Sequence, residues 1–102
     1  MELVVVQGDV LEFAFTVTDE SGQEYVLQDG EKFFFMVAPH CNSGNCEIHI
    51  VQTSKYFKVE NVELKPNVYD FDAGIIFADG TKKTLIDGDT GKLRVKRRVG
   101  PR

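Results

Sequence analysis

The chain has no tryptophan and, among its 102 residues, only two cysteines, three prolines and two histidines. No apolar run approaches the ~18 residues that a membrane-spanning helix needs. The first residues lack the basic stretch that begins a secretory signal, so we expect the protein to be made inside a cell and to act or be assembled there. No window of about 11 or more residues repeats its apolar side chains every 3.6 positions, which argues against a helical bundle.

The clearest pattern in the chain is an alternation of apolar and polar residues that ends in an Asp-Gly turn. Side chains alternate between the two faces of a strand, so apolar residues at every second position share one face. Asp79 and Gly80 follow this segment, and Lys82–Ile86 then leads back, which predicts a β-hairpin. The apolar residues of the first arm are Tyr69, Phe71, Ala73, Ile75 and Phe77.

Similar short segments recur along the whole chain. Seven to eight short strands with regular turns predict an all-β fold, and we expect one domain over residues 1–102 that is an antiparallel β-sandwich rather than a small barrel. Phe33, Phe35 and Val37 are placed to fill its core, while Phe34 and Met36 face outward. These strands are expected from nine candidate segments, residues 3–6, 10–18, 24–27, 32–38, 47–53, 56–60, 67–77, 82–86 and 91–99.

Charge is unevenly distributed. Residues 1–91 hold all 16 acidic residues and six lysines, a net charge of −10, whereas the C-terminal end 92–102 holds six cations and no acid. This division suggests an end that reaches an acidic surface, such as that of a neighbouring copy, although a solvated terminus has the same composition. We do not expect nucleic-acid binding, because the body repels phosphates and the basic end lacks aromatic residues that stack on bases.

One group of residues has the composition of a metal site. His40, Cys41, Cys46 and His49 lie within ten positions and are the residue types that zinc favours. The two cysteines are also close enough in sequence for a disulfide, and an ordinary polar loop fits the segment equally well. Without an export signal, reduced thiols are the default. His49 stands between two isoleucines and is expected to point outward from a strand.

Other chemistry has little support in the sequence. Asp70 and Asp72 share a strand face, an arrangement that suits acid–base work or calcium, but no loop of further oxygen ligands accompanies them. No nucleophile elbow, phosphate-binding loop or dinucleotide motif is present. We therefore expect no enzymatic activity, and we assign no catalytic residue, cofactor or metal.

The last third of the chain resembles a recurring phage module. Its pattern is similar to that of the immunoglobulin-like N-terminal domains of phage baseplate and tail-associated proteins, such as the baseplate upper protein. The resemblance implies an immunoglobulin-like fold and a structural role in a phage or prophage particle. The residues that carry it are Glu63–Phe71, Asp79-Gly80-Thr81, Thr84-Leu85-Ile86 and Gly88, with Gly8-Asp9 and Tyr25–Gly30 earlier in the chain.

From this resemblance we expect a non-enzymatic tail or baseplate assembly or adaptor module. It would bind other phage structural subunits or further copies of itself, away from membranes, in the bacterial cytoplasm during assembly and later in the virion. The alternative is a small phage-encoded or bacterial regulatory or inhibitory binding protein of the same fold. Edge strands at residues 3–6 and 91–99 are expected to pair with a neighbour. The expected contact residues are Phe34, Met36, Arg94, Lys96, Arg97 and Arg98.

Overall fold

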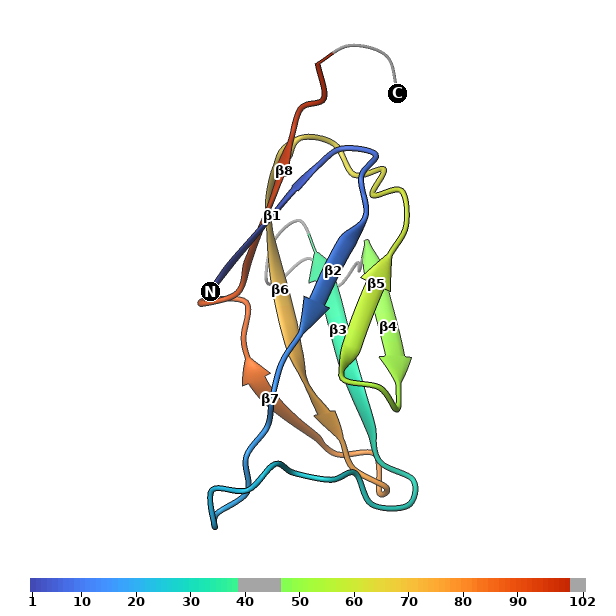
Figure 1. The fold of residues 1–102 in the computed structure, drawn as a ribbon, viewed down its shortest axis with the longest axis vertical. Helices are drawn as coiled ribbons and strands as arrows, with labels where there is room; N and C mark the ends of the chain where they lie inside the picture. Colours follow the sequence, from blue (N-terminus) through green and yellow to red (C-terminus); the bar gives the residue numbers. More distant parts are fainter. Residues whose placement is uncertain (39–46, 100–102) are drawn as a thin grey trace.

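The computed structural model describes residues 1–38 and 47–99, and this part of the chain is all-β, with eight strands and no helix (Figure 1). The predicted fold class is confirmed at that level. The strands are β1 (Glu2–Val6), β2 (Leu11–Ala14), β3 (Lys32–Ala38), β4 (Ile48–Gln52), β5 (Tyr56–Val59), β6 (Asn67–Ile76), β7 (Lys82–Ile86) and β8 (Lys92–Lys96).

Six of these strands form one mixed sheet, and the other two form a second. The larger sheet has the order β1-β8-β6-β3-β4, with β7 paired to the second half of β6. All its pairs are antiparallel except β1 with β8, which run parallel. A parallel pair needs a long connection, and here most of the chain lies between its two strands. The smaller sheet consists of β2 and β5, which are antiparallel.

The hairpin predicted from the Asp-Gly turn is confirmed. The N–H of Phe77 donates to the carbonyl oxygen of Thr81 at 2.8 Å, and Gly80 takes a φ of 91°, which glycine adopts without strain. The returning arm is divided into two strands. β7 pairs with the second half of β6, residues 87–91 loop outward, and β8 pairs with the first half. β6 therefore has partners on both sides, since β3 covers its other edge.

The core lies where the apolar alternation placed it. Tyr69, Phe71, Ala73 and Ile75 are buried, as are Phe33, Phe35 and Val37 of β3. Aromatic rings connect the two sheets. The ring of Phe13 on β2 lies 5.2 Å from that of Phe35 and 5.6 Å from that of Phe71, between centroids. Every buried residue in the described part of the chain is apolar.

Three details of the strand predictions were wrong. The segment 10–18 contributes only Leu11–Ala14, because β5 begins opposite Ala14 and no described strand continues beside residues 15–18. The segment 24–27 forms no strand, only an isolated bridge between Thr18 and Glu24. The terminal strand was expected at an edge of the sheet, but β8 lies inside it, between β1 and β6.

Gly74 on β6 occupies a position where a side chain does not fit. A Cβ atom there would lie 2.1 Å from the carbonyl oxygen of Lys83 and 3.0 Å from Cε1 of Phe34. Gly74→Ala should therefore push β6 and β7 apart and lower the free energy of unfolding by about 2–3 kcal/mol in urea denaturation. Gly22→Ala is the control: its φ is 84° but its surroundings are open, so the loss should be about 1 kcal/mol. Equal losses for the two variants would contradict this account.

Candidate protein-interaction surfaces

Phe34 is not the exposed contact residue that the sequence suggested. It lies on the face of the larger sheet away from the core, as expected, but it is only 1 % exposed. Its partner across the β3–β6 pair is Gly74, which has no side chain, so the ring lies close against the sheet there. The ammonium group of Lys82 lies 5.5 Å from the ring centroid on β7's side. Phe34 therefore packs within its own chain and offers little surface to a partner.

The remaining outward residues do not form one continuous apolar patch. Met36 is half-buried opposite Asp72 and His49 on the neighbouring strands, and Val51 is exposed beside the buried Phe34. His49 is exposed on β4, which confirms that it points outward. The other members of the proposed metal or disulfide group, residues 40, 41 and 46, lie outside the described residues.

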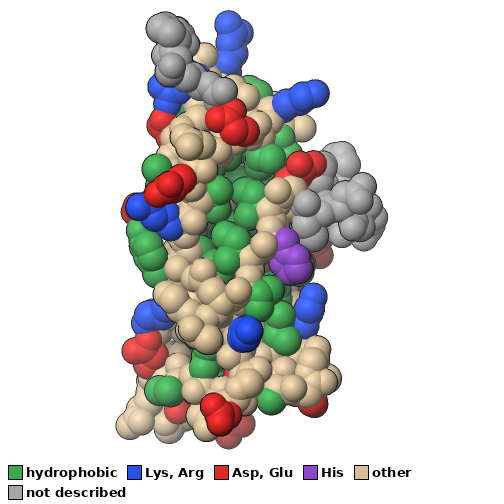
Figure 2. Space-filling model, turned by 90° about the vertical axis from the view of Figure 1, so that its right-hand side faces the viewer, with side chains coloured by type: hydrophobic (Ala, Val, Ile, Leu, Met, Phe, Trp, Pro, Cys, Tyr) green, Lys and Arg blue, Asp and Glu red, His purple; other side chains and the backbone are tan. Residues whose placement is uncertain are grey.

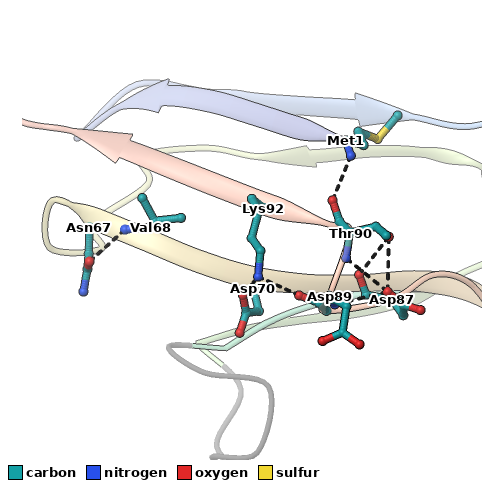
Figure 3. Close-up of polar contacts among 9 residues, drawn as sticks. Met1, Asn67, Val68, Asp70, Asp87, Asp89, Thr90 and Lys92 are labelled. Atoms are coloured by element: carbon teal, nitrogen blue, oxygen red, sulfur yellow. Dashed lines mark hydrogen bonds and ion pairs between the residues drawn. The ribbon is translucent and has the colours of Figure 1, made fainter.

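The cations of the terminal strand are largely engaged by acids of the same chain. Lys92 forms an ion pair with Asp70 and also donates to the carbonyl oxygen of Gly88 at 2.8 Å (Figure 3). Arg94 lies 3.6 Å from a carboxylate oxygen of Glu2. Arg94 stays exposed on β8 while it lies near this carboxylate.

Arg98 is likewise turned back onto its own chain. Its Nε donates to the carbonyl oxygen of Gln7 at 2.9 Å, and its guanidinium pairs with the carboxylate of Asp9. The basic end therefore holds the connection between β1 and β2. Within residues 1–38 and 47–99, the cations of this end that have no acidic partner are Lys96 and Arg97.

Asp72 lies in a partly buried acidic region near the loop of residues 87–91. Burial raises the pKa of its carboxyl group, the N–H of Gly88 opposes the rise by donating to it, and the charges of Asp87 and Asp70 add to it. Figure 3 shows the loop beside the first residue, whose terminal amino group donates to the carbonyl oxygen of Thr90 at 2.8 Å. In the described part of the chain no three His, Cys, Asp or Glu residues are grouped to hold a metal ion.

Two open cavities lie where strand edges have no neighbour. One, of 520 Å³, separates the extended residues 14–18 from Leu85 and Ile86 of β7 and reaches Met1. The other, of 560 Å³, is lined mainly by residues 24–31, with the hydroxyl of Tyr25 donating to Glu31 at 2.6 Å. Neither cavity contains a buried polar side chain among the described residues. Both therefore suit contact with a chain segment better than chemistry.

A further apolar surface lies on the β4–β5 side of the molecule. Figure 2 shows apolar side chains along a hollow in the middle of this side. The half-buried residues that pack against the core from these strands and the segment after β5 are Ile48, Ile50, Val59 and Leu64. Because β4 pairs only with β3, and β5 only with β2, the facing edges of both strands lack a neighbouring strand in the described structure.

The comparisons with known proteins give this surface no assigned role. No family model matches the chain, and no curated protein or solved structure matches it. No helix in the described residues is long and apolar enough to cross a membrane.

The raised pKa of Asp72 gives a pH-dependent prediction. Its folded-state pKa lies above the ordinary value of 3.8, so the stability linked to its protonation is present below the unfolded pKa and lost as pH rises through the folded pKa. Asp72→Asn removes the destabilisation caused by the ionised carboxylate in the folded state, and it keeps an oxygen that accepts from the N–H of Gly88. The variant should be more stable than the parent at about pH 7, by less than about 1 kcal/mol, with the gain disappearing near pH 3 in urea titrations.

Asp79→Asn is the control for the Asp72 variant and should have the opposite sign. The hydroxyl and N–H of Thr81 donate to the Asp79 carboxylate, at 2.7 and 3.0 Å, and lower its pKa. Its ionised form therefore stabilises the fold above the unfolded pKa, and this stability is lost as pH falls through the folded pKa. The Asn variant should be less stable at about pH 7, with a smaller difference in acid. A pH-independent change in either variant would contradict the proposed cause.

Proposed function

We propose that the two sheets form an immunoglobulin-like β-sandwich. The order β4-β3-β6-β8 has the arrangement of strands C′, C, F and G of that fold, and β2 with β5 corresponds to strands B and E. Ring contacts between Phe13 and both Phe35 and Phe71 support the packing of one sheet against the other. The additional strand β1 pairs in parallel with β8 and forms the edge of the larger sheet opposite β4.

We propose that the protein is a non-enzymatic assembly or adaptor module of a phage tail or baseplate, which acts through protein–protein contacts. The observation that carries this proposal is the contrast between interior and edges. The described interior holds no charged side chain, and its buried hydroxyl, that of Tyr69, donates to the carbonyl oxygen of Lys65 at 2.7 Å, whereas β1, β2, β4 and β5 each have an edge without a neighbouring strand. Unpaired edges are templates for strands from other chains.

The phage assignment is supported by the resemblance of the sequence pattern. Three of its four glycines occur where the chain needs a left-handed backbone: Gly8, Gly30 and Gly80 have φ values of 90°, 82° and 91°. These are turns that join the strands of the fold, so the resemblance reflects how the chain folds as well as its composition. The contact residues proposed from the terminal strand are Lys96 and Arg97, which remain exposed.

The proposal is tested by co-expressing the chain with the products of the genes beside its own and analysing the purified mixture by native mass spectrometry. A complex of fixed stoichiometry with a tail or baseplate subunit would support the structural role. A complex with a host enzyme or regulator, and none with a particle subunit, would contradict it and favour the inhibitory class of binding protein.

Variants of Arg97 and Arg98 distinguish a loss of partner binding from a loss of stability. Arg97→Glu should weaken such a complex about tenfold without changing the thermal midpoint, because Arg97 is exposed and has no acidic partner in the described residues. Arg98→Glu should lower the midpoint by several degrees, because it breaks the contacts with Asp9 and Gln7. Calorimetry and titration of both variants check this. An unchanged complex with Arg97→Glu would show that Arg97 lies outside the interface.

A further inference from the structure

The outer edge of β1 is poorly protected against pairing. Its residues Leu3–Val6 are four aliphatic residues in a row, with no proline, glycine or charge. By contrast, β7 carries two adjacent lysines and meets β6 at a bulge. Charge, proline and bulges are the usual means by which proteins prevent their edge strands from pairing with others. β1 has only Glu2, at its start.

The pairing with β8 determines which backbone groups of β1 are unused. The carbonyl oxygen of Met1 accepts from the N–H of Lys92, and the N–H of Gln7 donates to the carbonyl oxygen of Lys96, each at 2.9 Å. In a parallel pair the bonding residues of one strand alternate, so the odd-numbered residues of β1 bond to β8. The even-numbered residues direct their N–H and C=O groups to the outer side.

The unused groups therefore belong to Glu2, Val4 and Val6. Within the part of the chain that the structure describes, one of them has a hydrogen-bond partner: the carbonyl oxygen of Val6 accepts from the N–H of Asp9 at 2.9 Å. The remaining donors and acceptors form a regular row along an exposed edge. An antiparallel strand would satisfy such a row completely.

We propose that the occupant of this edge is the β1 strand of a second copy, placed antiparallel about a two-fold axis at Val4. Val4 then pairs with Val4 of the second copy, and Glu2 with Val6. Three pairs could exchange about six backbone hydrogen bonds; because the carbonyl oxygen of Val6 already accepts from Asp9 in each copy, about four of them use groups that are free in the monomer. A two-fold axis makes one surface complementary to itself, so no second type of site is needed.

Charge complementarity favours a second copy as the occupant. Glu2 faces Val6 of the second copy, and the neighbour of Val6 on β8 is Lys96, a cation without an acidic partner in the described residues. The pairing thus brings Glu2 of each copy toward Lys96 of the other copy. Across the sheet the row runs from Asp70 to Lys92 to Glu2, and then through Val6 to Lys96 of the second copy, so its charges alternate in sign.

The side chains at the centre of the pairing are apolar. Val4 is 49 % exposed, and its row across the sheet continues through Arg94 to the exposed Val68. Two copies of Val4 would cover one another at the axis, while the two Arg94 side chains would be kept apart by both β1 strands. Five residues of edge are a small interface compared with the roughly 1,600 Å² of a stable complex, so the dimer is weak and depends on concentration.

This inference deepens the proposed function, because it names one partner, but it is measured on the purified chain without any particle subunit. Sedimentation equilibrium from about 10 µM to 1 mM should show a monomer–dimer equilibrium. Val4→Pro removes the outward N–H of residue 4 and leaves the bonds to β8, because proline is accepted at an edge where its nitrogen faces outward. The variant should weaken the dimer at least tenfold.

Val4→Thr is the matched control, because it keeps the N–H and the branched side chain, and it should dimerise within about threefold of the parent. Circular dichroism of both variants reports whether the fold is kept. If the proline variant does not fold, charge exchange provides the test: Lys96→Glu should weaken the dimer, and the double variant Glu2→Lys with Lys96→Glu should restore it. A parent that stays monomeric at 1 mM, or a dimer insensitive to these changes, overturns the proposal.

A crosslink tests the register directly. In a chain with both native cysteines replaced by serine, Val4→Cys should form a covalent dimer on oxidation, because paired residues in antiparallel strands lie about 5.5 Å apart between Cα atoms. Val10→Cys, at a residue of similar exposure (47 %), should remain monomeric. Equal crosslinking of both variants would contradict the two-fold axis at Val4. Because no particle subunit takes part, a failure here leaves the complex measured for the proposed function intact.

Discussion

The packing of Phe13 against the larger sheet is the contact on which the rest of the structure depends. β2 and β5 form a sheet of only two strands, and a pair of strands in water is marginally stable by itself. Aromatic rings pack this pair of strands against the larger sheet: the rings of Phe13 and Phe57 contact that of Phe35, with centroids 5.2 and 5.6 Å away. Each such pair contributes about 0.5–1.5 kcal/mol beyond the area it buries. The aromatic cluster therefore joins the two sheets into one body.

Much of the fold could be predicted because its signals are local. The alternation at residues 69–77 and the Asp-Gly turn act within a few positions, and both the buried face and the hairpin followed from them. The pairing of β1 with β8 could not be predicted, because nothing near either strand determines a partner from the far end of the chain. The length of β2 could not be predicted for the same reason, because β2 ends opposite the residue at which β5 begins.

The candidate contact residues show the same limit. The sequence correctly predicted that Phe34 faces away from the core. Its burial could not be predicted, because it depends on the missing side chain of Gly74 on the neighbouring strand. The excess of cations at the C-terminal end was evident from the sequence, yet Arg98 finds its acid, Asp9, at a separation of 89 positions. A count of charges along the sequence cannot predict an ion pair between residues so far apart. The predicted cations of this end that have no acidic partner in the described residues are Lys96 and Arg97.

The parallel arrangement of β1 and β8 has a mechanical consequence. The two strands belong to opposite ends of the described chain, and they point the same way. Tension applied between residues 1 and 99 would slide one strand along the other, so that the bonds from Met1–Lys92 to Gln7–Lys96 would bear the load together. A hairpin pulled open at its ends loses its bonds one after another, whereas this shear geometry requires that all of them break at once.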